Sequence, residues 1–251
     1  VKEMSSADSR SMNSNELVYT FLEVYATDMI QQGRLQELLT FVEQLDYSSS
    51  KAKAFCRIAS GLVKVGKVDM ALNLVMGIED SYYKGRALLA LAPEIEKLGI
   101  YETWFRCVNA IPNLENRDEE LKKYSTKCAS RGEFQEAKRV AGFIRNEDQH
   151  LVAIGGISLE MAKIGRFEEA LQTIDQMRYT THGEAALGNI ALEMAKNKKV
   201  PEAISQANQI TNFERREKAL SKICLEMIEN GQVTEARNLV ERMHDRGYRD
   251  T

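Results

Sequence analysis

The chain has 251 residues, of which 43% are hydrophobic and 28% charged, a balance that excludes the composition of a disordered chain. Its net charge of −3 argues against a dedicated nucleic-acid binder, and no apolar run approaches the roughly 18 residues that cross a bilayer. We therefore expect neither nucleic acid nor a membrane as the partner. Only three prolines occur, which favours helices.

The chain opens with a polar segment and then becomes periodic. Residues 1–15 show no hydrophobic period, so we expect a disordered lead-in. Residues 16–245 form a predicted array of seven repeats of 33 residues, and residues 246–251 a short tail. One residue marks each repeat, and we call it the turn position and number the other positions from it. These residues are Gly33, Gly66, Gly99, Gly132, Gly165, Lys198 and Gly231.

In each repeat a first amphipathic helix precedes the turn position. Positions −11, −8, −7 and −4 are apolar or small, which is the i, i+3, i+4, i+7 stripe of one helix face. Position −7 is small in every repeat: Ala26, Ala59, Ala92, Ser125, Ser158, Ala191 and Cys224. We expect this stripe to face the core and position −7 to let a second helix approach closely.

A second helix follows the turn position, with apolar residues at positions +2 and +12 and a small residue at +5 in most repeats. Because glycine adopts the left-handed conformation at little cost, the turn position is expected to end the first helix. Lys198 stands there in the sixth repeat, so we expect Asn197 to take that conformation instead. Pro201 is expected to begin the second helix of this repeat.

The third repeat departs from the pattern at two residues. Pro93 lies within the first helix and lacks a backbone donor, which predicts a kink or an early end of that helix. Trp104 replaces the small residue at position +5 and is expected to push the two helices apart.

The array resembles the tetratricopeptide repeat, most closely in the segment Gly165-Arg166-Phe167-Glu168-Glu169-Ala170-Leu171. The period is one residue shorter than in that family, position +12 is bulky where the family prefers a small residue, and the family's late proline is absent. The resemblance implies an all-α fold, a right-handed α-solenoid of about seven antiparallel helical hairpins, whose first helices line a concave groove. The pentatricopeptide repeat, an RNA-binding relative with a 35-residue period and a basic composition, is less similar.

A groove of this kind would be formed by positions −13, −10, −9, −6, −3 and −2, which the core stripe leaves over. Basic residues outnumber acidic ones there, although the helix dipole also favours the lysines at position −2. Ten residues at these positions are candidate partner-binding residues. They are Lys53, Arg57, Arg86, Lys122, Lys123, Leu159, Asn189, Leu192, Lys218 and Lys222.

The same positions in repeats five and six are mostly small or apolar and include Gly155, Gly156 and Gly188. A glycine within a helix costs about 1 kcal/mol relative to alanine. Each of these glycines therefore indicates either contact with a neighbouring helix, which we favour, or the close approach of a ligand.

We expect no catalytic residue, no metal site and no cofactor. His150, His182 and His244 are expected in loops between repeats and lack the close spacing of metal ligands. The four cysteines show neither paired spacing nor a CxxC motif, which indicates buried or half-buried thiols in a reducing compartment. The sequence therefore favours a cytoplasmic protein.

These patterns favour a non-enzymatic scaffold that holds a protein or peptide, acidic or mixed acidic and apolar, in its groove. Two alternatives stay open: a structural assembly module that uses its ends or convex face, and an RNA-binding helical repeat. Val240 and Met243 are expected to be exposed in the last predicted helix, which also suggests self-association through that uncapped repeat.

Overall fold

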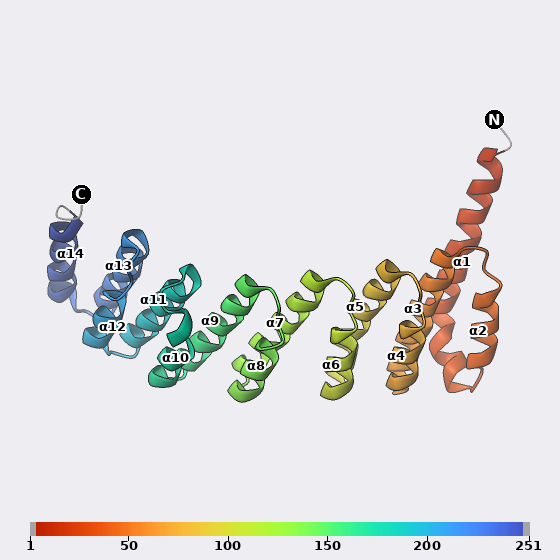
Figure 1. Cartoon of the computed structure of the whole chain (residues 1–251), viewed down its shortest axis with the longest axis horizontal. Coiled ribbons are helices and arrows are strands. Elements are labelled where there is room, and N and C mark those ends of the chain that lie inside the picture. The colour runs from red at the N-terminus through yellow and green to blue at the C-terminus, as the bar shows by residue number, and fades with distance from the viewer. Residues whose placement is uncertain (1–3, 248–251) are drawn as a thin grey trace. The chain divides into compact units, whose positions relative to one another are not determined.

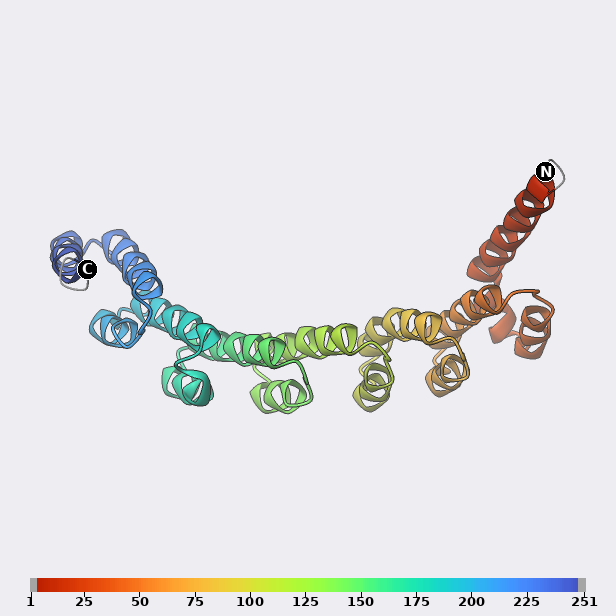
Figure 2. The same ribbon diagram turned by 45° about the horizontal axis from the view of Figure 1, so that its top comes forward.

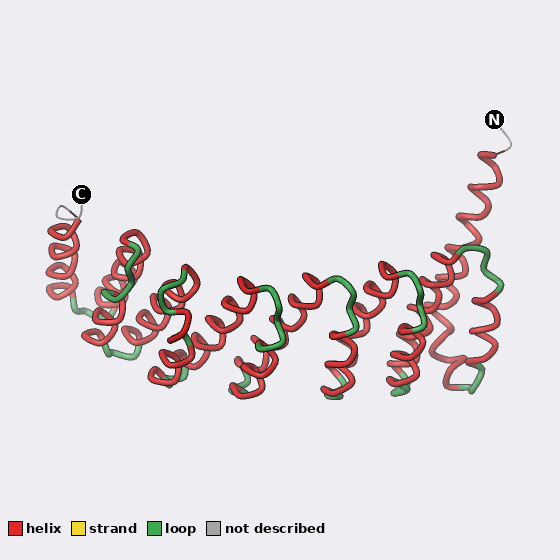
Figure 3. The backbone as a smooth tube through the Cα atoms, in the orientation of Figure 1, coloured by secondary structure: helices red, strands yellow, loops and turns green. Residues whose placement is uncertain are grey.

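The structure is a computed structural model that describes residues 4–247, with the side chains of residues 16–243. In this part of the chain every regular element is a helix, as the colouring of Figure 3 shows. The all-α prediction is confirmed. The chain divides into two units, residues 1–117 and residues 118–251.

The first unit alternates long and short helices. They are α1 (Met4–Gln31), α2 (Leu35–Glu43), α3 (Ser48–Lys64), α4 (Val68–Met76), α5 (Ser81–Lys97) and α6 (Tyr101–Asn109). Each long helix packs against the short helix that follows it, and α3 also packs against both α1 and α5. In two views the short helices lie on one side of the row of long helices (Figure 1, Figure 2).

Helix α7 (Leu114–Ser130) spans the boundary, and the second unit repeats the alternation. Its further helices are α8 (Phe134–Ala141), α9 (Glu147–Lys163), α10 (Phe167–Thr173), the 3₁₀-helix η1 (Asp175–Met177), α11 (Thr181–Lys196), α12 (Val200–Ala207), α13 (Phe213–Glu229) and α14 (Val233–Gly247). Helix α11 packs against both α9 and α13. The predicted pairing of helices is therefore confirmed in both units, while the right-handed solenoid stays a prediction.

The core lies between long and short helices, where the sequence pattern predicts it. All seven residues at position −7 are buried, and so are all seven at position +5. Trp104 is one of these, with 2% of its surface exposed. Small residues facing each other across the helix pair allow the close contact that buries the larger residues beside them.

The turn position is left-handed in all seven repeats. The six glycines have φ between 73° and 81°, and Lys198 has φ 62°. The prediction that Asn197 would take this conformation is wrong. The N–H of Lys199 donates to the carbonyl of Met194 just as that of Lys67 donates to Leu62, and this closing hydrogen bond holds Lys198 in place. Pro201 lies in the first turn of α12, as predicted.

The long helices begin earlier than the sequence pattern predicts. Helices α5, α9 and α13 begin at position −18, and the residue before each, at position −19, caps the helix: Asp80, Asn146 and Asn212. A side-chain cap is worth about 1 kcal/mol because it satisfies an N–H that has no partner in the helix.

Two segments differ from expectation. Helix α5 does not end early at Pro93 but continues to Lys97, and the exposed proline ring lies on its surface. Helix α1 begins at Met4, within the segment 1–15 that was expected to be disordered. Of the expected tail 246–251, helix α14 includes residues 246–247, and residues 248–251 lie outside the described residues.

Candidate peptide-binding surface

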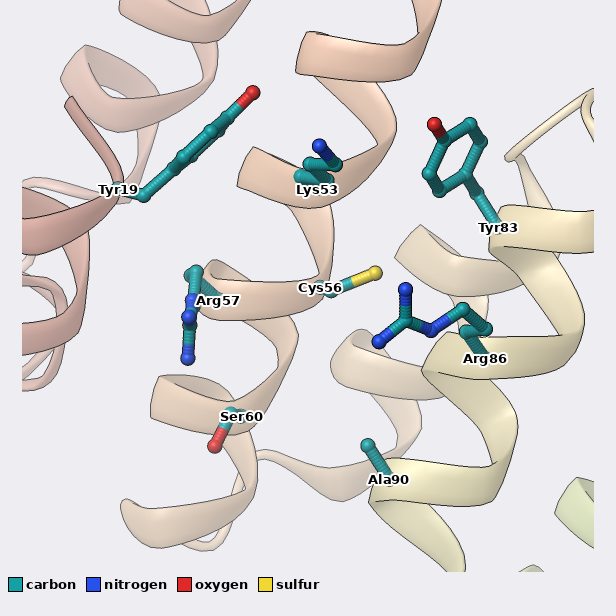
Figure 4. A pocket seen from close by; sticks show the side chains of 8 residues that line it. All are labelled: Tyr19, Lys53, Cys56, Arg57, Ser60, Tyr83, Arg86 and Ala90. Atoms are coloured by element: carbon teal, nitrogen blue, oxygen red, sulfur yellow. The ribbon is translucent and has the colours of Figure 1, made fainter. Parts of the chain in front are cut away.

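A pocket of about 460 Å³ opens on the long helices of the first unit. Helices α1, α3 and α5 line it with Tyr19, Lys53, Cys56, Arg57, Ser60, Tyr83, Arg86 and Ala90 (Figure 4). Three of these residues, Lys53, Arg57 and Arg86, are predicted groove residues. The structure therefore brings together cations that are up to 33 residues apart in the sequence.

The three cations of this pocket differ in their partners. A nitrogen of Arg57 lies 3.2 Å from a carboxylate oxygen of Glu23. Lys53 Nζ lies 5.6 Å from the ring centre of Tyr19, and the guanidinium carbon of Arg86 lies 5.8 Å from that of Tyr82. Neither Lys53 nor Arg86 forms an ion pair with a residue whose side chain is described. Two positive charges are thus open to an anion.

The Cys56 thiol lies in the same pocket and is half-buried. Figure 4 shows its sulfur pointing toward α5, while the Arg86 guanidinium points back toward α3. Burial raises the pKa of the Cys56 thiol above its ordinary value, and a backbone hydrogen bond and the charges of Arg57 and Arg86 offset this only in part. The thiol is therefore protonated at neutral pH and adds no negative charge to the pocket.

A second pocket, of about 240 Å³, opens on α11 and α13 in the second unit. It is lined by Glu184, Ala185, Gly188, Asn189, Arg215, Lys218, Ala219 and Lys222. Three of these, Asn189, Lys218 and Lys222, are predicted groove residues. Lys218 and Lys222 are exposed and form no ion pair among the described side chains.

Glu184 is the one carboxylate that lines this second pocket, and it is already hydrogen-bonded to neighbouring groups of the protein. With 4% of its surface exposed, it accepts hydrogen bonds from the backbone N–H groups of Thr211 and Asn212 at 2.9 and 3.1 Å, and one from Arg215 at 3.0 Å. Burial alone would raise the pKa of Glu184, but these donors and the Thr211 hydroxyl together hold its pKa below 4.5. Its carboxylate is paired with Arg215 and with the backbone of the loop, so the two lysines have no acidic partner among the described side chains.

The two pockets occupy the same place in the repeat. The leading helix contributes residues at positions −13, −10 and −9: Lys53, Cys56 and Arg57 in the first unit, and Ala185, Gly188 and Asn189 in the second. The following helix contributes positions −16, −13 and −9: Tyr83, Arg86 and Ala90, and then Arg215, Lys218 and Lys222. In both, a cation without an acidic partner among the described side chains stands at position −13 of the following helix, Arg86 or Lys218, so the two pockets present a positive charge at the same place.

The remaining predicted cations are neutralised. Lys122 forms an ion pair with Glu119, and Lys123 with Glu120. The position −2 lysines Lys97, Lys163 and Lys196 likewise pair with a glutamate three residues earlier. Such pairs fix the long side chains along the helix and lower the local positive charge. The structure does not place Lys122 or Lys123 in either pocket.

The predicted apolar residues Leu159 and Leu192 are half-buried and line neither pocket. The glycines nearby only partly follow the favoured interpretation. A Cβ on Gly155 would lie 3.6 Å from that of Ala186, and one on Gly188 would lie 3.4 Å from that of Ala219, which are contacts with the next long helix. Gly156 would meet only Thr126, at 3.9 Å. Helix contact therefore explains the location of two glycines, but there is room for a methyl group at all three.

Sequence reasoning missed the aromatic and acidic members of the pockets, and also Arg215. Tyr19, Tyr83, Glu184 and Arg215 lie at positions −14 and −16, before the predicted start of the first helix. The signal that could have found them is the Asp or Asn at position −19 in Asp80, Asn113, Asn146 and Asn212, since such residues favour helix starts.

Other expectations concern chemistry. Among the described residues no group of three or more His, Cys, Asp or Glu is arranged to hold a metal ion. His150 and His182 lie in the first turns of α9 and α11 rather than in loops, and both are half-buried. The four cysteines form no disulfide in the described part of the chain, and Cys56 is half-buried while the other three are buried, as predicted. None of the described helices has the length and apolar character needed to span a membrane.

The predicted self-association surface lies on α14. Val240 is 44% exposed, whereas the residue at the same position, +9, is buried in each of the six earlier repeats. Those residues are Val42, Val75, Val108, Ala141, Ile174 and Ala207. Met243 is half-buried, so the predicted exposure holds for Val240 and only in part for Met243.

Comparison with known proteins gives little beyond this geometry. No model of a known protein family matches the chain, and no curated protein is significantly similar to it. Among solved structures, Ton1535 from Thermococcus onnurineus NA1 aligns over 96% of this chain and 89% of its own, with 14% identity and a TM-score of 0.34. A similarity of this size carries no argument about function.

Proposed function

We propose that the chain is a non-enzymatic scaffold of the tetratricopeptide-like kind, which holds a peptide or protein segment against its long helices. The segment is acidic, or mixed acidic and apolar. One observation carries this proposal: the same positions of the repeat form a pocket in each unit, and each pocket presents two cations without an acidic partner among the described side chains. An acidic segment provides the carboxylates that pair with such cations.

The proposal includes the right-handed solenoid and the cytoplasmic location inferred from the sequence. It is favoured over an RNA-binding array because most basic groove residues outside the pockets already pair with glutamates, and the whole chain carries −3. A polyanion as long as RNA requires a continuous basic surface rather than separate cationic pockets.

The test uses the full chain and two fluorescein-labelled libraries of 15-residue peptides. One library is rich in Asp and Glu, and in the other Asn and Gln replace these residues. We expect the acidic library to bind more tightly and the binding to weaken as salt rises, because exposed charges are screened. The double reversal Lys53→Glu with Arg86→Glu should weaken binding at least fivefold, and so should Lys218→Glu with Lys222→Glu. Anisotropy measures each affinity.

A matched control is Arg34→Glu with Lys67→Glu, which makes the same charge change at the starts of α2 and α4, outside both pockets. This variant should bind as the unaltered chain does. Equal losses in control and pocket variants would show that only net charge matters. If neither library binds, the proposal is wrong.

A further inference from the structure

The two pockets lie at the same positions of the repeat but are lined by different side chains. This difference indicates which chemical group the first pocket binds. We propose that the pocket of α1, α3 and α5 takes a phosphorylated side chain of the bound segment, whereas the α11–α13 pocket takes a carboxylate. The inference rests on the proposed function and narrows its ligand class.

The charge of the first pocket exceeds what one carboxylate can neutralise. Its lining includes three cations and no carboxylate, and Arg57 pairs with Glu23 of α1, which is not among the lining residues. Subtracting that one acid from the three cations leaves a formal charge of +2, which a carboxylate of −1 would satisfy only by half. A phosphate monoester carries about −1.5 to −2 near pH 7 and matches it.

The donors of the pocket also suit a phosphate. The guanidinium of Arg86 points into the space between α5 and α3, with the ring of Tyr83 beside it on the same helix (Figure 4). A guanidinium fork donates to two oxygens of one anion in a fixed planar geometry, whereas a lysine ammonium acts as a point charge, and a phosphate has a third oxygen that a carboxylate lacks. Lys53 and the hydroxyl-bearing residues Tyr19, Ser60 and Tyr83 line the same pocket from three helices. The protonated Cys56 thiol does not repel an anion there.

The second pocket has the same formal charge of +2, because Glu184 offsets one of its three cations, but it lacks these donors. It has about half the volume, and no aromatic residue lines it. The one arginine, Arg215, is bound to the buried carboxylate of Glu184. Lys218 and Lys222 remain as point charges, which suit a carboxylate. The second pocket therefore provides an internal control for the first.

Cys56 gives a direct measure of occupancy. It is the half-buried cysteine of the chain and lies in the pocket, while Cys107, Cys128 and Cys224 are buried. The full chain is treated with N-ethylmaleimide at pH 8.5, and the rate of Cys56 modification is followed by mass spectrometry. The three buried cysteines should stay unmodified, and their reaction would reveal an unfolded variant.

The probes are labelled peptide libraries with one fixed central residue, either phosphoserine, phosphotyrosine, glutamate or serine. A mixed-sequence single-stranded RNA and inorganic phosphate complete the set. We expect a phosphorylated library to slow Cys56 modification at least fivefold and to bind at least tenfold more tightly than the glutamate library. Arg86→Ala should remove that preference and Arg86→Lys most of it, because lysine keeps the charge without the fork. Lys67→Ala and Lys218→Ala should retain the preference.

Equal binding of phosphorylated and glutamate libraries would overturn this inference and leave the proposed function standing. Failure of every peptide library would overturn both. Stronger protection by the RNA would identify the pocket as a nucleic-acid site, and full protection by millimolar inorganic phosphate alone would identify free phosphate as the ligand. Either result contradicts the inference.

Discussion

The carboxylate of Glu184 accepts a hydrogen bond from the backbone N–H of Asn212, the residue that caps the next long helix, α13. Asp118 does the same for Asn146, the cap of α9, at 2.8 Å. Both acids stand at position −14 of their repeats. Each therefore fixes the loop that leads into the following long helix, and so sets where that helix begins.

Removing this acceptor should destabilise the second unit. Glu184→Ala leaves the N–H groups of Thr211 and Asn212 without their acceptor and Arg215 without its charge partner, at a cost of about 1–3 kcal/mol. Urea unfolding of the full chain measures the loss. Glu229→Ala, an exposed glutamate at the end of α13, is the control and should stay within about 0.5 kcal/mol.

The contribution of Glu184 should depend on pH in a defined direction. Its pKa in the folded chain lies below 4.5, so its stabilising effect is complete above about pH 4.5 and is lost as the pH falls through the lowered folded value. The difference in unfolding free energy between the unaltered chain and Glu184→Gln should therefore shrink between pH 7 and pH 3.5. A difference that grows on acidification would contradict the assigned direction of the shift.

A substitution in the left-handed turn of the sixth repeat should increase the stability of the chain. Lys198 has φ 62°, a conformation that costs a residue with a Cβ about 1–2 kcal/mol, so Lys198→Gly should stabilise the chain by about 0.5–1 kcal/mol despite greater freedom when unfolded. The reverse change is Gly165→Ala. A Cβ there would meet nothing within 4 Å, so the expected loss of about 1 kcal/mol comes from the backbone alone. Thermal unfolding should shift in opposite directions for the two variants.

Two glycines of α11 should respond oppositely to alanine. A Cβ on Gly183 would lie 1.8 Å from the carbonyl oxygen of Met177, so Gly183→Ala forces backbone movement and should cost about 2 kcal/mol or more. A Cβ on Gly188 would touch Ala219 at an ordinary 3.4 Å, so Gly188→Ala should be neutral or stabilise by up to about 1 kcal/mol through helix propensity. Destabilisation by both would show that α11 and α13 pack more tightly than these distances indicate.

The sequence by itself determined the elements and their faces. The left-handed turns follow from glycines 33 residues apart, and the core follows from the apolar stripe with its small residue at position −7, such as Ala59. It also placed Lys53, Arg86, Lys218 and Lys222 on the surface of the long helices. Helix periodicity and turn conformation are local properties, so single residues and their spacing are enough to specify them.

Only the tertiary structure decided which surface cations are free. Lys123 and Lys218 look alike in the sequence, but the first is paired with Glu120 and the second has no acidic partner among the described side chains. The pockets also depend on long helices that begin before the predicted start, and on side chains about 30 positions apart, such as Cys56 and Arg86, that line one pocket. Those relations depend on the spacing of neighbouring helices and the rotamers of long side chains, which a periodic pattern does not encode.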